Sequence, residues 1–310
     1  MRAVAIVATY NEEIHITNCI DSLTKNGLEV YVIDNESTDR TKAIAESFQG
    51  RGVIGVETFP RHGVYRWRQI LERKEELAAE LEADWIMHTD PDEIRLSPWA
   101  GISLAQAFEK VEDAGYNAVN FFEFTFIPTL ESPNHEHTRY EETMRWYYPY
   151  FLEHPGPALP KYFGRVTPRY FGRASPKLPH HLKAWRKQSC VALAWSGGHI
   201  VRFEGLKAFP QSFSTKHYEF LSVEHAIRKY CDRTFDAREV ENGWHGWRAK
   251  LRPEMIVLPS ECQLRRYKSD ESLDRSNPRT MEYLEELYES HVETTSDCKS
   301  VLEEKLGPRT

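Results

Sequence analysis

Residues 84–95 read DWIMHTDPDEIR, a short apolar run followed at once by acidic side chains. The run at 84–87 is typical of a buried strand. It leads into Asp90, Asp92 and Glu93, three carboxylates within four positions. Because like charges this close repel one another, the pattern predicts a counter-charge, most simply Mg²⁺ or Mn²⁺ shared with a ligand's phosphates. An acidic loop that stabilises the N-terminus of a helix is the alternative interpretation.

The first third of the chain alternates apolar runs with amphipathic segments. We expect strands at 2–8, 30–33, 53–56 and 85–87, and helices at 14–23, 40–48 and 65–81. Such alternation predicts an α/β fold with a mostly parallel central sheet flanked by helices and a ligand crevice at the carboxyl ends of the strands. A helix at 103–114, capped by Ser103, and a strand at 116–126 follow.

Polar residues stand where the expected strands end. Thr9, Tyr10 and Glu12 follow the first strand, and Asp34 follows the second. We expect them to meet the carboxylate cluster in one crevice, because parallel strands end at the same edge of a sheet. The chain contains neither GxGxxG nor a P-loop lysine motif, which disfavours a dinucleotide-binding protein.

Composition excludes several classes of protein. The net charge of −7 disfavours nucleic acid as a partner. The five cysteines are far apart and lack CxxC spacing, which fits a reducing cytosol. No apolar run reaches about 18 residues, so we expect a cytoplasmic protein whose contact with the inner face of the cell membrane, if any, is peripheral.

The segment 161–187 is basic and aromatic, with eight lysines and arginines and no acid. We expect four of its residues to form an acceptor or membrane surface: Arg165, Arg169, Arg173 and Trp185. Such a surface binds anions, stacks on sugar rings or lies on an anionic membrane. A solvated loop is the alternative.

The second half offers two more candidate residues. Glu123 lies among aromatic residues in the expected strand at 116–126, where a carboxylate could have a raised pKa and act as a base; a solvent-facing position is the alternative. Sheet character resumes at 191–203 around two glycines, which suit either a close approach to a ligand or an ordinary hairpin. His217 precedes a helix capped by Ser222, and a lone histidine is more often structural than a metal ligand.

With these residues in view, the chain resembles the family 2 glycosyltransferases of the GT-A fold. Three motifs in order carry the resemblance: VATYNEE at 7–13, VIDNESTDRT at 32–41, and WIMHTDPDE at 85–93, which matches the DxD motif. Beyond residue 116 the likeness is looser. SGGH at 196–199 and KHYEFLSVEHAIRKY at 216–230 resemble the C-terminal part of bacterial members, in which a histidine often completes the metal site.

The resemblance implies a nucleotide-diphosphate sugar donor and a divalent metal. Thr9, Tyr10 and Glu12 would line the nucleoside pocket, and Asp34 would accept a hydrogen bond from the base. Asp90 would reach the ribose. Asp92 would hold the metal, with Asp90 and His217 as further ligands. Asn35 stands where the family often has a second aspartate, so UDP and another nucleotide both stay open.

The resemblance also implies a catalytic base beyond the DxD motif in members that invert the anomeric centre. The chain offers Glu123 and Glu204, and Glu93 lies close to the metal. None of them belongs to a recognisable ED pair. We expect Glu123 to be the base, with Glu93 as the other catalytic candidate.

Together these observations predict a metal-dependent glycosyltransferase of the hexosyltransferase type. It would move a sugar from a nucleotide-diphosphate sugar, first of all a UDP-sugar, to a glycan, lipid-linked or small-molecule acceptor with inversion. Residues 1–127 would form the donor half and 128–250 the acceptor half, which includes the aromatic and basic insertion and completes the metal site. Residues 251–310 would form a C-terminal helical extension.

Two other functions compete with this one. A nucleotidyltransferase normally shows a glycine-rich basic loop after the first strand, whereas VATYNEE at 7–13 is acidic. A non-catalytic protein that binds nucleotide sugars or a membrane surface is the other alternative. Intact Asp90 and Asp92 argue against it.

Overall fold

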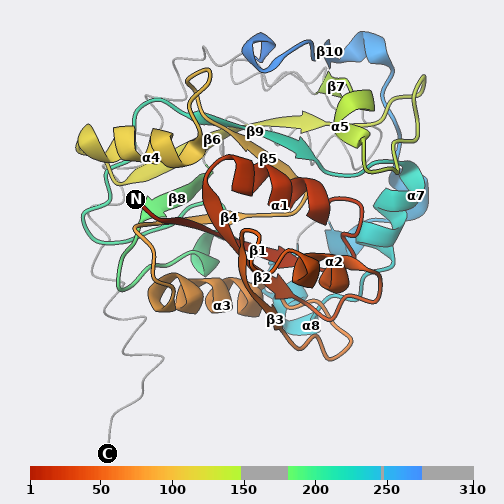
Figure 1. Ribbon diagram of the computed structural model, residues 1–310. Helices are drawn as coiled ribbons and strands as arrows, with labels where there is room; N and C mark the ends of the chain where they lie inside the picture. Colours follow the sequence, from red (N-terminus) through yellow and green to blue (C-terminus); the bar gives the residue numbers. More distant parts are fainter. Residues whose placement is uncertain (148–180, 246–247, 274–310) are drawn as a thin grey trace, which may run out of the picture.

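The computed structural model describes residues 1–147, 181–245 and 248–273 (Figure 1). Several expectations lie outside these residues: Arg165, Arg169, Arg173 and the part of the expected C-terminal helical extension at 274–310. Among the described residues, no helix has both the length and the apolar character needed to cross a lipid bilayer.

Four parallel strands form the first half of the sheet, in the order β3-β2-β1-β4. They are β1 Ala3–Thr9, β2 Leu28–Asp34, β3 Val53–Thr58 and β4 Trp85–Thr89. The helices between them are α1 Ile16–Lys25, α2 Thr41–Ser47 and α3 Trp67–Glu80. The predicted alternation and the parallel central sheet are confirmed, with boundaries that differ by only a few residues.

The second half of the sheet mixes parallel and antiparallel strands. It contains β5 Glu93–Leu96, β6 Ala118–Phe126, β7 Trp146–Tyr147, β8 Leu182–Arg186, β9 Phe213–Tyr218 and β10 Arg265–Arg266. Strand β8 lies antiparallel between β4 and β6 and so joins the two halves. Strand β9 runs parallel to β6 and antiparallel to β5, which sets His217 opposite both Glu93 and Thr125.

The remaining elements are short apart from α4. They are α4 Leu104–Asp113, α5 Tyr140–Thr143, α7 Val223–Ala226 and α8 Ala237–Glu241, the π-helical turn η3 Ile227–Cys231, and the 3₁₀ turns η2 Ala194–Ser196, η4 Arg248–Lys250, η5 Pro253–Met255, η6 Glu261–Gln263 and η7 Asp270–Ser272. Ser103 and Gln106 form a capping box at α4, as the sequence predicts. Ser222 caps α7, also as predicted.

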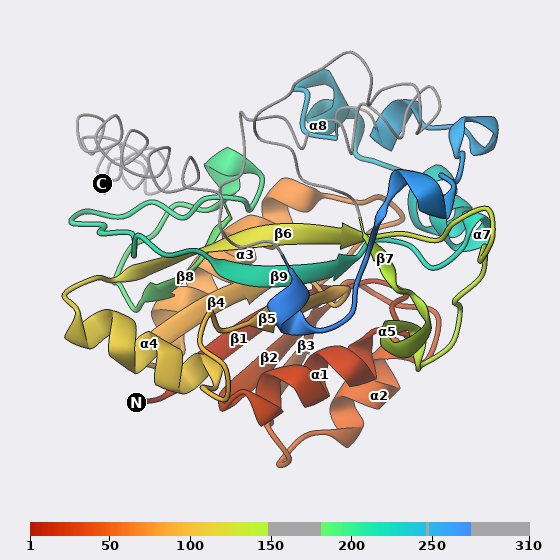
Figure 2. The ribbon, with the colours of Figure 1, turned by 90° about the horizontal axis from the view of Figure 1, so that it is seen from above.

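Helices cover both faces of the sheet because the strands alternate their apolar side chains (Figures 1 and 2). Ala3, Ala5 and Val7 of β1 pack with α1 and α4, whereas Val4 and Ile6 pack with α3. A third cluster surrounds β6 and β9 beside α5, α7 and the segment 251–273. The two sheet faces are therefore closed by apolar packing, and the strand ends stay available for polar side chains.

Two expectations need correction. Trp185 lies in β8 with 1% of its surface exposed and packs in the core with α3, so it belongs to no acceptor or membrane surface. Residues 191–203 form η2 and isolated bridges instead of a strand, because Gly197 and Gly198 turn the chain with φ of +68° and +86°. Of the expected C-terminal helical extension, the structure describes residues 251–273, which contain 3₁₀ turns and β10, so the extension as a whole stays a prediction.

Candidate active site

A cleft of about 520 Å³ opens where β1, β4, β6 and β9 bring their polar ends together. The sequence-predicted residues that line it are Thr9, Tyr10, Glu12, Asp90, Asp92, Glu123 and His217. Asp34 and Glu93 are not among the lining residues, and Glu204 is exposed elsewhere. The predicted convergence of these strand ends on one crevice is thus confirmed for most of the candidates.

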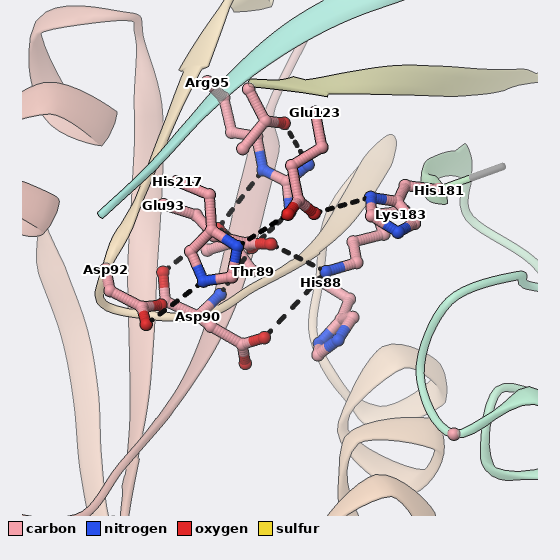
Figure 3. A network of polar contacts seen from close by, with 12 residues as sticks. His88, Thr89, Asp90, Asp92, Glu93, Arg95, Glu123, His181, Lys183 and His217 are labelled. Atoms are coloured by element: carbon pink, nitrogen blue, oxygen red, sulfur yellow. Dashed lines mark hydrogen bonds and ion pairs between the residues drawn. The ribbon is translucent and has the colours of Figure 1, made fainter. Parts of the chain in front are cut away.

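Glu93 stabilises the turn between β4 and β5 through hydrogen bonds and ion pairs (Figure 3). Its Oε2 accepts hydrogen bonds from the Asp90 backbone N at 3.0 Å and from Thr89 Oγ1 at 3.2 Å, and it pairs with Arg95. Its Oε1 lies 2.8 Å from Lys183 Nζ. Burial opposes ionisation of Glu93, but the charges of Arg95 and Lys183 outweigh it and hold its pKa well below the usual value. These contacts give Glu93 a structural task, and its expected catalytic role stays a prediction.

His217 lies between two carboxylates. Its Nδ1 is 2.9 Å from Glu123 Oε1, and its Nε2 is 3.3 Å from Asp92 Oδ2 (Figure 3). Strand pairing explains the arrangement, because β9 carries His217 between β5 and β6. Burial opposes ionisation of Glu123, but His217 and His181 outweigh it and lower the pKa of Glu123. The raised pKa expected for this residue is therefore wrong.

Asp90 faces two lysines that the sequence did not single out as site residues. Lys74 of α3 and Lys183 of β8 each bring Nζ to 3.9 Å from the Asp90 carboxylate. Lys74 is fully buried and donates to His88 Nδ1 at 2.7 Å. Burial lowers the pKa of Lys74 to about 8. Lys183, which the sequence placed in the basic surface segment, is buried as well.

Glu12 and Asp92 share a third lysine. Lys229, on the π-helical turn η3, brings Nζ to 2.6 Å from Asp92 Oδ2 and 3.3 Å from Glu12 Oε1. The other Glu12 oxygen lies 2.7 Å from His15 Nδ1. Glu12 is thus held in a buried charged network at the edge of the cleft.

The far end of the cleft is aromatic and cationic. The Arg61 guanidinium stacks on Tyr10 at 3.7 Å, and Arg233 lies over Tyr65 at 4.8 Å. Tyr10, Tyr65 and Arg233 line the cleft. None of these cation–ring contacts was predicted from the sequence, because they join residues far apart in the chain.

Asp34 and Asn35 divide the end of β2 between two tasks. Asp34 is buried and accepts from the Ser37 backbone N at 3.1 Å. Asn35 lines the cleft, and its Oδ1 is buried without a hydrogen-bond partner among the described residues. Asp34 is thus engaged within the protein, whereas Asn35 contributes to the lining of the cleft.

Asp92 and His217 have the chemistry and spacing of two ligands of one divalent ion. Adjacent ligands of an octahedral ion are about 3 Å apart when each bond is about 2.1 Å. A histidine that binds a metal usually donates its other ring N–H to a carboxylate, as Nδ1 of His217 can to Glu123. Asp90 stands apart from this pair, towards Lys74 and Lys183.

Two other groups of ligand-type atoms lie within 4.8 Å of one another: Glu93 with Glu123 and His217, and Glu12 with His15 and His225. In the first group, Glu93 is already bound by Lys183 and Arg95. In the second, Nδ1 of His225 accepts from the Leu221 backbone N at 3.0 Å, so a neutral ring carries its proton on Nε2. Asp92 and His217 both line the cleft, and Asp92 likewise carries an ion pair, with Lys229.

A comparison with known protein families gives a match to the N-terminal segment that contributes to this site. Residues 4–69, which span β1 to the start of α3, match the model of glycosyl transferase family 2. This segment is therefore similar to glycosyl transferase family 2. The α/β fold with its parallel first half agrees with the GT-A fold that the resemblance implied. No curated protein matches the chain.

Solved structures of partial similarity include two named enzymes. S. aureus TarS 1-349 is 15% identical over 70% of this chain and 60% of that one, with a TM-score of 0.38. In its complex with UDP the match is 20% identical over 42% of this chain and 36% of that one, with a TM-score of 0.30. Glucosyl-3-phosphoglycerate synthase from Mycobacterium tuberculosis is 21% identical over 39% of this chain and 44% of that one, with a TM-score of 0.27. The chain thus covers less than two thirds of each of these chains.

Proposed function

We propose that the protein is a metal-dependent glycosyltransferase that moves a sugar from a nucleotide-diphosphate sugar, first of all a UDP-sugar, to an acceptor hydroxyl with inversion. The observation that carries the proposal is the pair Asp92 and His217, oriented by Glu123 at the mouth of the parallel strands. The family 2 match over residues 4–69 ends before this pair, so the two lines of support are independent.

The donor would lie with its nucleoside at the aromatic end of the cleft. Tyr10 and Tyr65 line that end with Arg61 and Arg233 over their rings, and Asn35 Oδ1 offers a buried acceptor without a partner among the described residues. Thr9, next to Tyr10 in the sequence, would line the nucleoside pocket, and Asp90 would reach the ribose. Stacking and a few directed hydrogen bonds are the usual means by which such clefts fix a nucleoside.

Asp92 and His217 would hold Mn²⁺ or Mg²⁺. The ion would supply positive charge against the negative charge that develops on the departing nucleoside diphosphate. Glu123 would keep Nε2 of His217 aimed at the ion. Glu93, bound to Lys183 and Arg95, would keep the turn that carries Asp92 in place.

Glu123 is the base of the proposal, because it lines the cleft and Glu93 does not. A base must lie within hydrogen-bond reach of the acceptor hydroxyl. Glu123 Oε2 faces His181 Nδ1 at 3.2 Å, and a hydroxyl would enter beside this contact. The acceptor, whether glycan, lipid-linked or small, would approach past Trp195 and His199, which line the same side of the cleft.

Turnover of the donor tests the proposal. Purified protein is incubated with UDP-glucose, UDP-galactose or UDP-N-acetylglucosamine and Mn²⁺, and released UDP is measured. We expect slow hydrolysis of one donor that disappears in Asp92→Asn and persists in Asp113→Asn, which removes an exposed charge at the end of α4. Pyrophosphate release from UTP and a sugar phosphate would favour a nucleotidyltransferase instead. Nucleotide binding without any turnover would favour the non-catalytic alternative.

A further inference from the structure

Lys229 occupies the position at Asp92 that a metal would need. Its Nζ lies 2.6 Å from Asp92 Oδ2, the same oxygen that faces His217 Nε2 at 3.3 Å. The lysine side chain is only 10% exposed, yet it lines the cleft. It is carried by the π-helical turn η3, and such turns are frequently found at functional sites.

The chain already supplies the counter-charge that the acidic sequence motif requires. Five carboxylates gather at this end of the cleft: Glu12, Asp90, Asp92, Glu93 and Glu123. Their cationic partners are Lys74, Lys183, Lys229, Arg95 and His217. Cationic side chains of the protein therefore supply the counter-charge that the sequence analysis expected from a metal. At Asp92 the partners are Lys229 and His217.

An ammonium group and a divalent ion cannot both occupy Asp92 Oδ2 without strong repulsion, since unit charges a few ångströms apart in a partly buried site interact by several kcal/mol. Glu12 offers Lys229 a second anchor at 3.3 Å, so the ammonium group can leave Asp92 and stay in the cleft. Because Lys229 lines the cleft, its charge would then face the diphosphate of the proposed donor there.

We propose that Lys229 is an internal counter-ion that competes with the divalent metal for Asp92 and moves onto the donor's diphosphate when metal and donor bind together. The second part rests on the proposed function; the first part does not. The protein alone binds metal weakly, because the ion must displace Lys229. Donor and metal then strengthen each other's binding, since the diphosphate accepts the displaced ammonium group.

The test is Mn²⁺ binding by the full chain without nucleotide, followed by the electron spin resonance signal of free Mn²⁺. The variants are Lys229→Met, Lys229→Arg and the control Arg228→Met, which removes a charge from the same turn at a side chain that pairs with Glu136 on the surface. We expect Lys229→Met to bind Mn²⁺ at least about tenfold more tightly than the unaltered protein. Lys229→Arg and Arg228→Met should stay near the unaltered value, and Asp92→Asn in the Lys229→Met background should abolish the gain.

Unchanged or weaker Mn²⁺ binding by Lys229→Met would overturn the proposal. Lys229→Met removes the cation that the buried carboxylates of Glu12 and Asp92 share. The thermal unfolding of this variant is therefore also measured with and without Mn²⁺. A larger Mn²⁺-induced rise in melting temperature than in the unaltered protein supports competition, and an equal or smaller rise contradicts it.

The contact with the diphosphate is tested by titrating UDP and GDP in the presence of EDTA. We expect weak binding by the unaltered protein that falls at least about tenfold in Lys229→Met. Equal binding by both would overturn the movement of Lys229 onto the diphosphate. If neither nucleotide binds any variant, even with Mn²⁺, the proposed function fails, whereas tighter Mn²⁺ binding by Lys229→Met would still establish the competition.

Discussion

Oε1 of Glu123 lies 2.9 Å from Nδ1 of His217, across the parallel pairing of β6 and β9. This contact fixes the ring so that Nε2 faces Asp92. The arrangement links a strand in the middle of the sheet to the acidic turn after β4. It gives Glu123 a definite effect on any metal held there, whatever part it takes in the chemistry.

Two substitutions separate the roles of Glu123. Glu123→Ala removes the acceptor for His217 Nδ1 and should weaken Mn²⁺ binding by about 10-fold to 100-fold, the usual cost of losing such a partner. Glu123→Gln keeps an acceptor oxygen, so it should bind Mn²⁺ nearly normally but lose turnover if Glu123 is the base. Mn²⁺ titration and UDP release measure the two effects. Full turnover by Glu123→Gln would remove Glu123 as the base.

Replacing Glu93 should damage stability more than any single step of the reaction. In Glu93→Gln the buried side chains of Arg95 and Lys183 lose their anionic partner, which we expect to cost about 3 to 5 kcal/mol of unfolding free energy. Urea unfolding measures this loss. Glu142→Gln breaks a solvent-exposed pair with Arg139 and should change stability little. A stable but inactive Glu93→Gln would restore the catalytic role that the sequence suggested.

Gly198 and Gly197 form a matched pair for testing the loop that closes the cleft beside α3. Both have positive φ, but a Cβ on Gly198 would lie 3.0 Å from His88 Nε2 and from Leu71 Cδ2, whereas one on Gly197 would meet nothing nearer than 3.9 Å. Gly197→Ala should cost about 1 to 2 kcal/mol from backbone strain alone. Gly198→Ala should cost more, because the loop must also move away from His88. Equal costs by urea unfolding would contradict the close packing of this loop.

His225 should make the protein sensitive to mild acid. Burial, together with the charges of Lys229 and His15, lowers its pKa to about 3, below the value of about 6.5 expected for an unfolded chain. The folded state favours the neutral ring, so its contribution is complete above about pH 6.5 and is lost as the pH falls towards 3. His225→Asn keeps an acceptor for the Leu221 backbone N and cannot take up a proton. As the pH is lowered from about 6 to about 4, the unfolding free energy of His225→Asn should fall by about 1.4 kcal/mol per pH unit less than that of the unaltered protein. Equal pH dependence of the unfolding free energy in the unaltered protein and in His225→Asn, measured by urea unfolding, would contradict this assignment.

The sequence predicted the elements that local pattern controls. The alternation of β1 to β4 with α1 to α3 follows from apolar periodicity, and the cap at Ser103 follows from its capping box. The meeting of Asp90, Asp92 and the residues after β1 follows from the rule that parallel strands end at one edge. Each of these predictions needs only short stretches of chain and a general rule of sheet geometry.

The remainder depends on pairings between distant segments. Nothing local shows that β9 inserts beside β5 and so brings His217 to Asp92, or that β8 carries Lys183 into the interior. A lysine in a basic segment resembles a surface residue until its partner Glu93 is known. The sequence pattern does indicate that Lys74 is unusual, because it interrupts the buried apolar face of α3 formed by Ile70, Leu71, Leu77 and Ala78. A charge in that position indicates a buried partner.

The most direct test of the nucleotide-sugar site is calorimetric titration of UDP and GDP into the protein with Mn²⁺ and again with EDTA. The measurement is repeated on Asp92→Asn and on the exposed control Asp113→Asn. We predict that one nucleotide binds in a manner strengthened by Mn²⁺, that Asp92→Asn loses this strengthening, and that Asp113→Asn keeps it. No binding of either nucleotide to the unaltered protein, or equal Mn²⁺-dependent binding by Asp92→Asn, would contradict the assignment of the cleft.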